Sequence, residues 1–332
     1  MTSLPAPAKV RRVLVVDDSA FMRRVIADMI GSTGEFEVIG TGRDGEDAIR
    51  QVRALELGAV DFVQKPSGPI SLDLASVREQ LFGALRAAAD AQCRPRISVV
   101  PSSRDYVRTT AEQRFATTVG TTTVGMGARA LQRDVREPRY LLCIASSTGG
   151  PAALSCIVPQ LTLPDGAACI VVQHLPPAFT ASLAQRLHSV SRAPVVEVSN
   201  GMRLLSGVVY IARGGYHIVV EKEGGLHFSL TEEPPLWGVR PAADPLFASV
   251  ARCFGARTLG VVLTGMGRDG ADGLRVIRSA GGIAVVQDPD TSIVSGMPAA
   301  ALELAGADHV SSLDLMASTI EGALQNLVGR SA

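Results

Sequence analysis

The sequence predicts an α/β protein whose C-terminal part forms a doubly wound, mostly parallel sheet with an antiparallel hairpin. Two observations lead to this fold class. From residue 139 onward, short apolar runs alternate with helical segments, which is typical of parallel sheets. One stretch of closely spaced β-rich runs then interrupts the alternation. With 332 residues, the chain is long enough for two domains that each bury a core.

The expected strands of the C-terminal part span 139–145, 168–173, 194–198, 258–264 and 282–287. The interrupting stretch, 208–230, contains the runs VVYIA, YHIVVE and LHFSL, and the last two are joined across KEGG. We expect these two runs to form an antiparallel hairpin at the margin of the sheet.

The N-terminal region begins like a βαβ unit. An apolar run ending in acids (VLVVD) at 13–17 precedes a helical stretch at 19–30 and a second strand at 36–40. A helical pattern at 44–58, a strand at 59–63, a KPSG turn and a helix around 72–89 follow. Periodicity fades between 94 and 138, so we predict an N-terminal domain over 1–90, a flexible linker over 91–138 and the α/β domain over 139–332.

Charge and hydropathy narrow the range of functions. Lys plus Arg and Asp plus Glu both number 32, so no net charge draws the protein to nucleic acid or to an anionic membrane. No apolar run approaches the roughly 18 residues of a spanning helix, and the first residues lack the apolar core of a signal peptide. We therefore expect a cytoplasmic protein without direct membrane insertion.

Side chains suited to acid-base chemistry follow the ends of three predicted strands. Ser147 lies on a tight turn between a strand and a helix, His174 directly follows a strand, and Asp269 lies in a Gly-rich loop. Ligands of open α/β sheets bind beyond the carboxyl ends of the strands. A serine nucleophile, a histidine base and an orienting aspartate would together cleave a carboxyl ester or amide.

Each of these residues also has an ordinary explanation. The Ser147 loop fits G-x-S-x-G only loosely, because Ala145 replaces the first glycine, and such a loop is also typical of a phosphate cradle. His174 alone fits a structural histidine, and Asp269 alone a turn former. A dinucleotide site would need the G-x-G-x-x-G order and an acidic residue about 20 positions later, which are absent.

Four motifs together resemble the catalytic domain of the chemotaxis protein-glutamate methylesterases. They are SSTGGPAAL, QHLPPAFT, RPAADPLFASVA and LTGMGRDGADGL, and the resemblance runs from 140 to 328. It implies that Ser147, His174 and Asp269 form the triad. Ser146, where the family usually has Ala, is then a bystander.

The resemblance also implies supporting residues. Backbone near Thr148 and Met266 is expected to stabilise the oxyanion. Arg240, Asp244 and the GMP segment at 296–298 match the family pattern and are expected to shape the pocket, although Arg240 fits a surface salt bridge equally well.

The activity that the resemblance implies is hydrolysis of γ-glutamyl methyl esters on chemoreceptor helices, which releases methanol. Many members of the family also deamidate receptor glutamines. The expected partners are therefore methyl-accepting chemoreceptors, and neither a metal nor an organic cofactor is implied. The alternative is a catalytically idle module that still binds a receptor or regulates.

The N-terminal region resembles a response-regulator receiver that has lost its middle. VLVVDDSAF at 13–21 with Arg23, and GAVDFVQKP at 58–66, match the first and last parts of a receiver. In receivers the acidic pair, here Asp17 and Asp18, holds Mg²⁺, and a lysine, here Lys65, lies on the fifth strand.

Residues 13–67 are only 55 in number, so the third and fourth strands and the phosphoacceptor aspartate are missing. We expect a remnant with an open edge at its first strand, no functional Mg²⁺ site and no phosphorylation control. Recognition by a chemotaxis histidine kinase would be weakened. The loss would leave the active site either permanently accessible or unstably covered.

Overall fold

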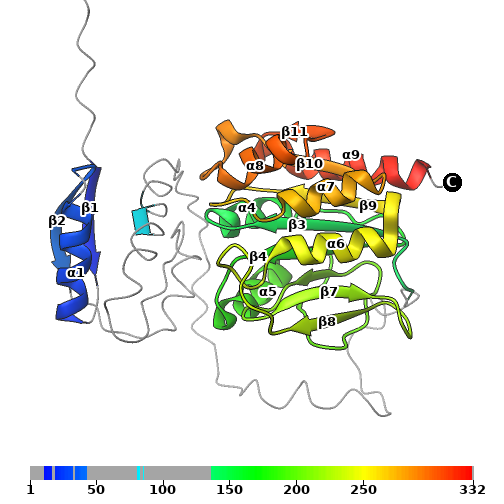
Figure 1. Cartoon of the computed structure of the whole chain (residues 1–332), viewed down its shortest axis with the longest axis horizontal. Coiled ribbons are helices and arrows are strands. Elements are labelled where there is room, and N and C mark those ends of the chain that lie inside the picture. Colours follow the sequence, from blue (N-terminus) through cyan, green and yellow to red (C-terminus); the bar gives the residue numbers. More distant parts are fainter. Residues whose placement is uncertain are drawn as a thin grey trace, which may run out of the picture. The chain divides into compact units, whose positions relative to one another are not determined.

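The computed structural model describes residues 11–16, 19–32, 34–42, 81–82, 85 and 136–330. Residues 136–330 form an α/β unit around a seven-stranded sheet of order β11-β10-β9-β3-β4-β6-β5, in which all neighbouring strands are parallel (Figure 1). The strands are β3 (Tyr140–Ser146), β4 (Ala167–Gln173), β5 (Val195–Glu197), β6 (Val209–Ile211), β9 (Thr258–Val262), β10 (Ile283–Gln287) and β11 (His309–Ser311).

Helices cover both faces of this sheet. One core cluster joins β3 and β4 to α4 (Gly150–Ile157), α5 (Pro177–Val190) and α9 (Leu313–Arg330). A second cluster joins the other face to α6 (Ala243–Phe254), α7 (Ala271–Ser279) and α8 (Gly296–Leu304). Single turns of 3₁₀ helix lie at Gly255–Arg257 and Pro289–Thr291. The predicted doubly wound α/β fold is therefore confirmed.

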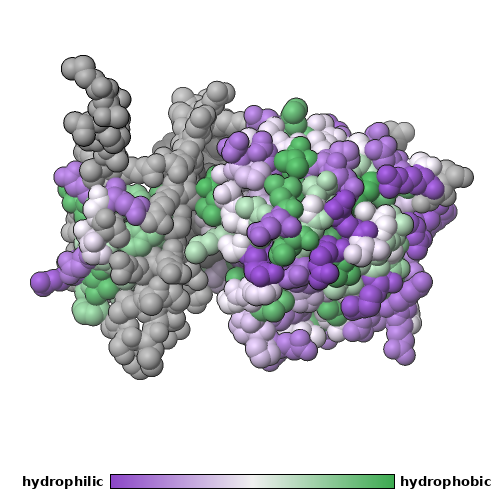
Figure 2. Space-filling view, turned by 45° about the horizontal axis from the view of Figure 1, so that its top comes forward, coloured by the Kyte–Doolittle hydropathy of each residue, from purple (hydrophilic) through white to green (hydrophobic). Residues whose placement is uncertain are grey.

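The central strands are apolar on both faces because both faces are covered. Every residue of β3 and β4 is buried, which explains why LLCIA and AACIVV read as continuous apolar runs without alternation. Away from these cores, the surface mixes many hydrophilic residues with smaller hydrophobic patches (Figure 2).

The predicted hairpin is confirmed, but its predicted position at the margin of the main sheet is wrong. β7 (His217–Glu221) and β8 (His227–Thr231) form their own antiparallel sheet. Ile218, Val220 and Phe228 pack in the same core cluster as α6, and the Val220 N–H donates to Ser249 Oγ on α6 at 3.0 Å. The hairpin therefore covers the α6 face and does not extend the edge of the main sheet.

Two short strands were not placed correctly by the sequence. The run VVYIA contributes β6, which lies between β4 and β5 in the main sheet. β11, at the opposite edge, was not predicted. Each of these strands has three residues, too few for a periodicity signal, and their pairing depends on the neighbouring strands.

The strand order reverses at β3. From this strand the sheet continues through β4 to β6 and β5 on one side, and through β9 to β10 and β11 on the other. Helices on both faces diverge at such a switch point and leave a crevice at the carboxyl ends of the strands, where α/β proteins bind ligands.

The N-terminal residues form a separate small arrangement. β1 (Arg11–Val16) pairs in parallel with β2 (Phe36–Gly42), and α1 (Ala20–Gly31) connects them. Ser19 caps α1 by accepting a hydrogen bond from the Met22 N–H at 3.3 Å. Phe36 stacks on Phe82, with ring centroids 6.1 Å apart, beside Val15 and Ile30. The predicted βαβ opening is thus confirmed.

Several predictions concern residues outside the described ones. These are Asp17, Asp18, Lys65, the helix at 44–58, the strand at 59–63, most of the helix at 72–89 and nearly all of the linker at 91–138. Within the described residues, β1 has β2 as its sheet partner. No helix in this part of the chain combines the length and apolarity that crossing a membrane requires.

Candidate active site

The three residues singled out in the sequence lie beyond the ends of adjacent strands. β3 lies between β4 and β9, and its last residue, Ser146, is in register with Gln173. The backbone N–H of His174 donates to the Ser146 carbonyl at 3.1 Å. The N–H of Ser147 donates to the Thr264 carbonyl after β9 at 3.0 Å. These hydrogen bonds hold the serine, the histidine and the β9 loop at one edge of the sheet.

His174 and Asp269 form a buried pair. Nε2 of His174 lies 2.7 Å from Oδ2 of Asp269, and their side chains are 7% and 2% exposed. Asp269 also accepts backbone hydrogen bonds from Ala243 at 2.6 Å and from Asp244 at 3.1 Å. These N–H groups belong to the first turn of α6, whose own N-cap residue, Ala242, supplies no side-chain cap. Asp269 therefore caps α6 from another segment of the chain.

This environment keeps Asp269 ionised. Burial by itself raises the pKa of the carboxyl group, but the hydrogen bond and charge of His174 and the two N–H groups of α6 together lower the pKa below its ordinary value. A helix N-terminus also favours a negative charge electrostatically.

The His174–Asp269 pair determines which ring nitrogen of His174 can accept a proton. With a carboxylate as the acceptor, Nε2 carries the proton, and Nδ1 has a free lone pair. Nδ1 is buried and has no hydrogen-bond partner among the residues that the structure describes. The half-buried Ser147 hydroxyl does not bond to it in this conformation. A buried, unpaired polar atom is uncommon in native structures and calls for an explanation.

The turn after β3 depends on glycine. Gly149 has φ of 78°, and a Cβ there would lie 2.8 Å from Cβ of Ile293. The chain therefore turns tightly from Ser147 into α4. The backbone N–H groups of Thr148 and Met266 donate to no acceptor in the described part of the chain.

The two adjacent serines differ in their surroundings. Ser146 is fully buried, and its hydroxyl donates to Oε1 of Gln173 at 2.7 Å. Gln173 in turn donates through Nε2 to the Ser147 carbonyl at 2.9 Å. Ser146 and Gln173 thus hold the serine turn, and Ser147 keeps the accessible hydroxyl. The sequence analysis missed Gln173, although a polar residue that ends an apolar strand directly before His174 is a usable signal.

The β9 loop approaches the serine closely. A Cβ at Gly265 would lie 2.7 Å from Cβ of Ser147 and would also collide with Sδ of Met297. Met297, in the GMP segment, is buried and donates its N–H to the Gly265 carbonyl at 2.9 Å. The segment 296–298 therefore fixes the loop from which the Met266 N–H projects.

Arg240 and Asp244 make different kinds of contact. Arg240 donates through Nη1 to the carbonyls of Glu232 and Glu233, at 2.9 Å each, and forms no ion pair within the described residues. Asp244 is buried and accepts hydrogen bonds from the Gly273 N–H and from Trp237 Nε1. Burial and the neighbouring Asp269 charge raise the pKa of Asp244.

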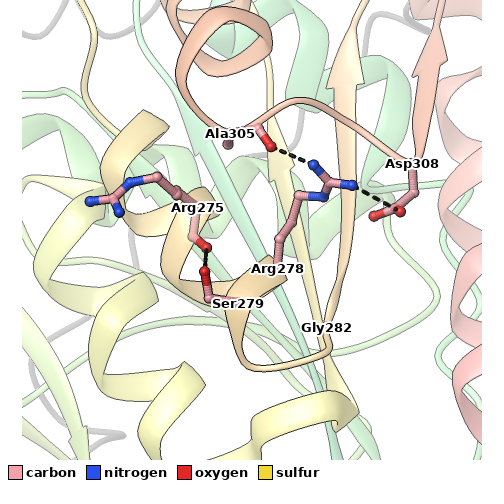
Figure 3. A pocket seen from close by; sticks show the side chains of 6 residues that line it. All are labelled: Arg275, Arg278, Ser279, Gly282, Ala305 and Asp308. Carbon is pink, nitrogen blue, oxygen red and sulfur yellow. Dashed lines mark hydrogen bonds and ion pairs between the residues drawn. The ribbon is translucent and has the colours of Figure 1, made fainter.

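A surface pocket of about 330 Å³ lies elsewhere on the unit (Figure 3). It is lined by residues that include Gly282 and Asp308, which immediately precede β10 and β11, so it lies at the amino ends of the strands, opposite the triad edge. Arg278 points across it to the Ala305 carbonyl and to Asp308. Arg278 is thus held by two partners at this pocket.

In the described part of the chain, no cluster of three or more His, Cys, Asp or Glu side chains is arranged to hold a metal ion. The components present are a serine hydroxyl, an imidazole with one free nitrogen and an ionised carboxylate. These are the components of nucleophilic acyl transfer through an acyl-enzyme.

The chain is similar to known proteins over most of its length. It is 38% identical to the protein-glutamate methylesterase/protein-glutamine glutaminase of Symbiobacterium thermophilum, over 94% of this chain and 97% of that protein. It is 35% identical to the protein of the same name from Pyrococcus abyssi, over 98% and 97%. The Thermotoga maritima CheB methylesterase catalytic domain superposes with a TM-score of 0.53 at 37% identity, over 55% of this chain and 97% of that chain.

The family model described as CheB methylesterase matches residues 142–320, which include the serine turn, His174, Asp269 and all the segments that hold them. The match spans more than half of the chain and coincides with the α/β unit. The chain therefore belongs to the CheB methylesterase family.

Proposed function

We propose that this protein is a cytoplasmic protein-glutamate methylesterase and protein-glutamine glutaminase that acts on methyl-accepting chemoreceptors in a chemosensory pathway. Family membership and the names of its relatives support this reaction. The observation that carries the proposal is the buried His174–Asp269 pair, in which Nδ1 of His174 has no partner among the described residues. Ser147 directly follows Ser146, the last residue of the neighbouring strand β3.

The first half of the reaction forms an acyl-enzyme. In the proposed first step, Nδ1 of His174 accepts the proton of Ser147 Oγ as Oγ attacks the ester carbonyl carbon. Asp269 stabilises the imidazolium and keeps the proton on Nε2. The tetrahedral intermediate then collapses, Nδ1 gives its proton to the methoxy oxygen, and methanol leaves.

The second half releases the product. His174 accepts a proton from water, which attacks the acyl-enzyme carbonyl, and then returns a proton to Ser147 Oγ, leaving a free glutamate side chain. A glutamine substrate follows the same steps with ammonia as the leaving group. The free N–H groups of Thr148 and Met266 support their assignment as the oxyanion hole in both halves.

Methanol release from methylated chemoreceptor membranes tests this function. We expect release by the wild type and none above background by Ser147→Ala. Equal release by both would contradict the triad. Receptor binding without release by the wild type would indicate the alternative, an idle receptor-binding module.

We further propose that residues 1–90 are an incomplete receiver and that 91–138 link it to the esterase. The β1–α1–β2 arrangement supports a receiver origin, and the short distance from the DD pair at 17–18 to the KP turn at 65–66 supports the loss of its middle. Acetyl phosphate should then neither label the chain nor change methanol release. Stable phosphoryl incorporation would contradict this, and it would restore a role for a chemotaxis histidine kinase as a partner.

A further inference from the structure

Trp237 has an unusual backbone and an exposed ring. It is the chain's single tryptophan, and it has φ of 55°, the left-handed region that bulky residues avoid. It lies on a turn in which Leu236 and Val239 pair, and 48% of its surface is exposed. A left-handed backbone and a half-exposed ring are together unusual for a tryptophan.

Two contacts hold the ring in place. Its Nε1–H donates to Oδ2 of Asp244 at 2.8 Å, and the guanidinium of Arg268 stacks over it, with Cζ 4.5 Å from the ring centroid. An aromatic ring held on one edge and one face has little conformational entropy left to lose when a ligand packs against it.

The stack lies beside the triad. Arg268 directly precedes Asp269 in the β9–α7 loop. The backbone N–H of Asp244, whose side chain holds the indole, donates to Oδ1 of Asp269. Trp237 is therefore connected to the Asp269 carboxylate in two ways: through Asp244, which binds both residues, and through Arg268, which stacks on the indole and precedes Asp269. The neighbouring Met266, in the same loop as Arg268, is 43% exposed.

Arg268 retains a usable charge. Its ion pair with Asp272, at 3.2 Å, is between side chains that are 44% and 37% exposed. Exposed pairs of this kind contribute little free energy, so the guanidinium can still bind an incoming carboxylate. Tryptophan and arginine are also the side chains most often responsible for binding energy at protein interfaces.

We propose that Trp237 and Arg268 form a recognition wall for the receptor helix. The indole packs against the aliphatic part of residues that flank the esterified glutamate, and Arg268 binds the carboxylate of a flanking acidic residue. This inference rests on the proposed function and identifies specificity residues for it. Neither residue touches the reacting atoms.

Kinetics on methylated chemoreceptor membranes test the wall. Trp237→Ala should raise KM about tenfold and leave kcat nearly unchanged, because it removes binding that is equal in the ground and transition states. Trp237→Phe keeps a ring but loses the hydrogen bond to Asp244, so its KM should stay within about threefold of the wild type. A fall in kcat in both variants would instead indicate that Trp237 only supports Asp244 and would overturn the proposal.

Arg275 provides a matched control for the charge. It lies on α7, is exposed, and pairs with the same Asp272 at 3.6 Å, whereas Arg268 is the partner of Trp237. Arg268→Gln should raise KM about fivefold and weaken its dependence on salt, and Arg275→Gln should change neither. Equal effects of the two variants would overturn the proposal.

The two proposals fail in different ways. Absence of methanol release by the wild type, or full activity of Ser147→Ala, refutes the proposed function. Normal release by the wild type, with unchanged KM in Trp237→Ala and in Arg268→Gln, refutes the wall alone. If thermal unfolding measurements show that Trp237→Ala is not folded, the KM values of Trp237→Phe and Arg268→Gln test the proposal instead.

Discussion

Oδ2 of Asp269 lies 2.7 Å from Nε2 of His174, so the carboxylate binds the nitrogen farther from the histidine main chain. In the serine-protease arrangement the aspartate binds Nδ1 and the serine faces Nε2. In this protein the two nitrogens have the opposite partners: Nε2 of His174 binds the aspartate, and Nδ1 is the candidate base. The chemical roles are unchanged because either nitrogen can accept a proton when the other is protonated.

Replacing each serine in turn should separate the nucleophile from its neighbour. Ser147→Ala should lower kcat about 10⁴-fold or more. Ser146→Ala removes a buried hydroxyl that donates to Gln173, so it should lower stability by about 1–3 kcal/mol and leave kcat within about tenfold. Methanol release and urea unfolding measure the two effects. If Ser146→Ala lost more activity than Ser147→Ala, Ser146 and not Ser147 would be the nucleophile.

Asp269→Asn should affect activity and stability together. An amide can donate to Nε2 and so favour the tautomer with a proton on Nδ1, which cannot act as a base; kcat should fall about 10⁴-fold. The amide also loses the charge that caps α6, at a cost of about 1–2 kcal/mol.

The matched control is Asp272→Asn on α7, which removes an exposed carboxylate that pairs with Arg268 and Arg275. It should change kcat and stability little. Comparable losses in both variants would argue against a specific role for Asp269.

The stabilising effect of Asp269 should depend on pH. The interactions that lower the pKa of this carboxyl group below 3.8 outweigh the burial that raises it. Its ionised form therefore favours folding. The contribution is present in full above the unfolded-state pKa, about 4, and is lost as the pH falls through the lower folded-state value.

Urea unfolding of the wild type and of Asp269→Asn from pH 7 to pH 3 measures this linkage. The difference in their unfolding free energies should be constant above about pH 5 and shrink below about pH 4. A difference that grows toward acid would give the opposite sign and contradict the prediction.

Gly265→Ala should displace the serine. The added Cβ would collide with Cβ of Ser147 and with Met297, so the β9 loop must shift. We expect about a hundredfold loss of kcat and about 1–3 kcal/mol of stability. Gly322→Ala on α9, where a Cβ meets nothing within 4 Å, should leave kcat unchanged and stabilise the helix slightly. Wild-type kcat in Gly265→Ala would show that the loop tolerates the shift.

Much of the site followed from the sequence because it depends on strand ends. β3, β4 and β9 are long, apolar and buried, so their limits were predicted within two residues, and the polar residues after them could be identified. In a parallel sheet these ends share one edge whatever the order of the strands. The apolar runs and the polar residues that follow them were therefore enough to place Ser147, His174 and Asp269 together.

The sequence by itself determined the α/β class, the hairpin and the identity of the candidate triad, because these depend on local periodicity and on short motifs. Only the tertiary structure decided that Asp269 caps α6, that Gln173 holds both serines, that β6 lies inside the sheet, and that Arg268 covers Trp237. Each of these depends on contacts between segments distant in the chain, and the geometry of such contacts is set by how the whole core packs.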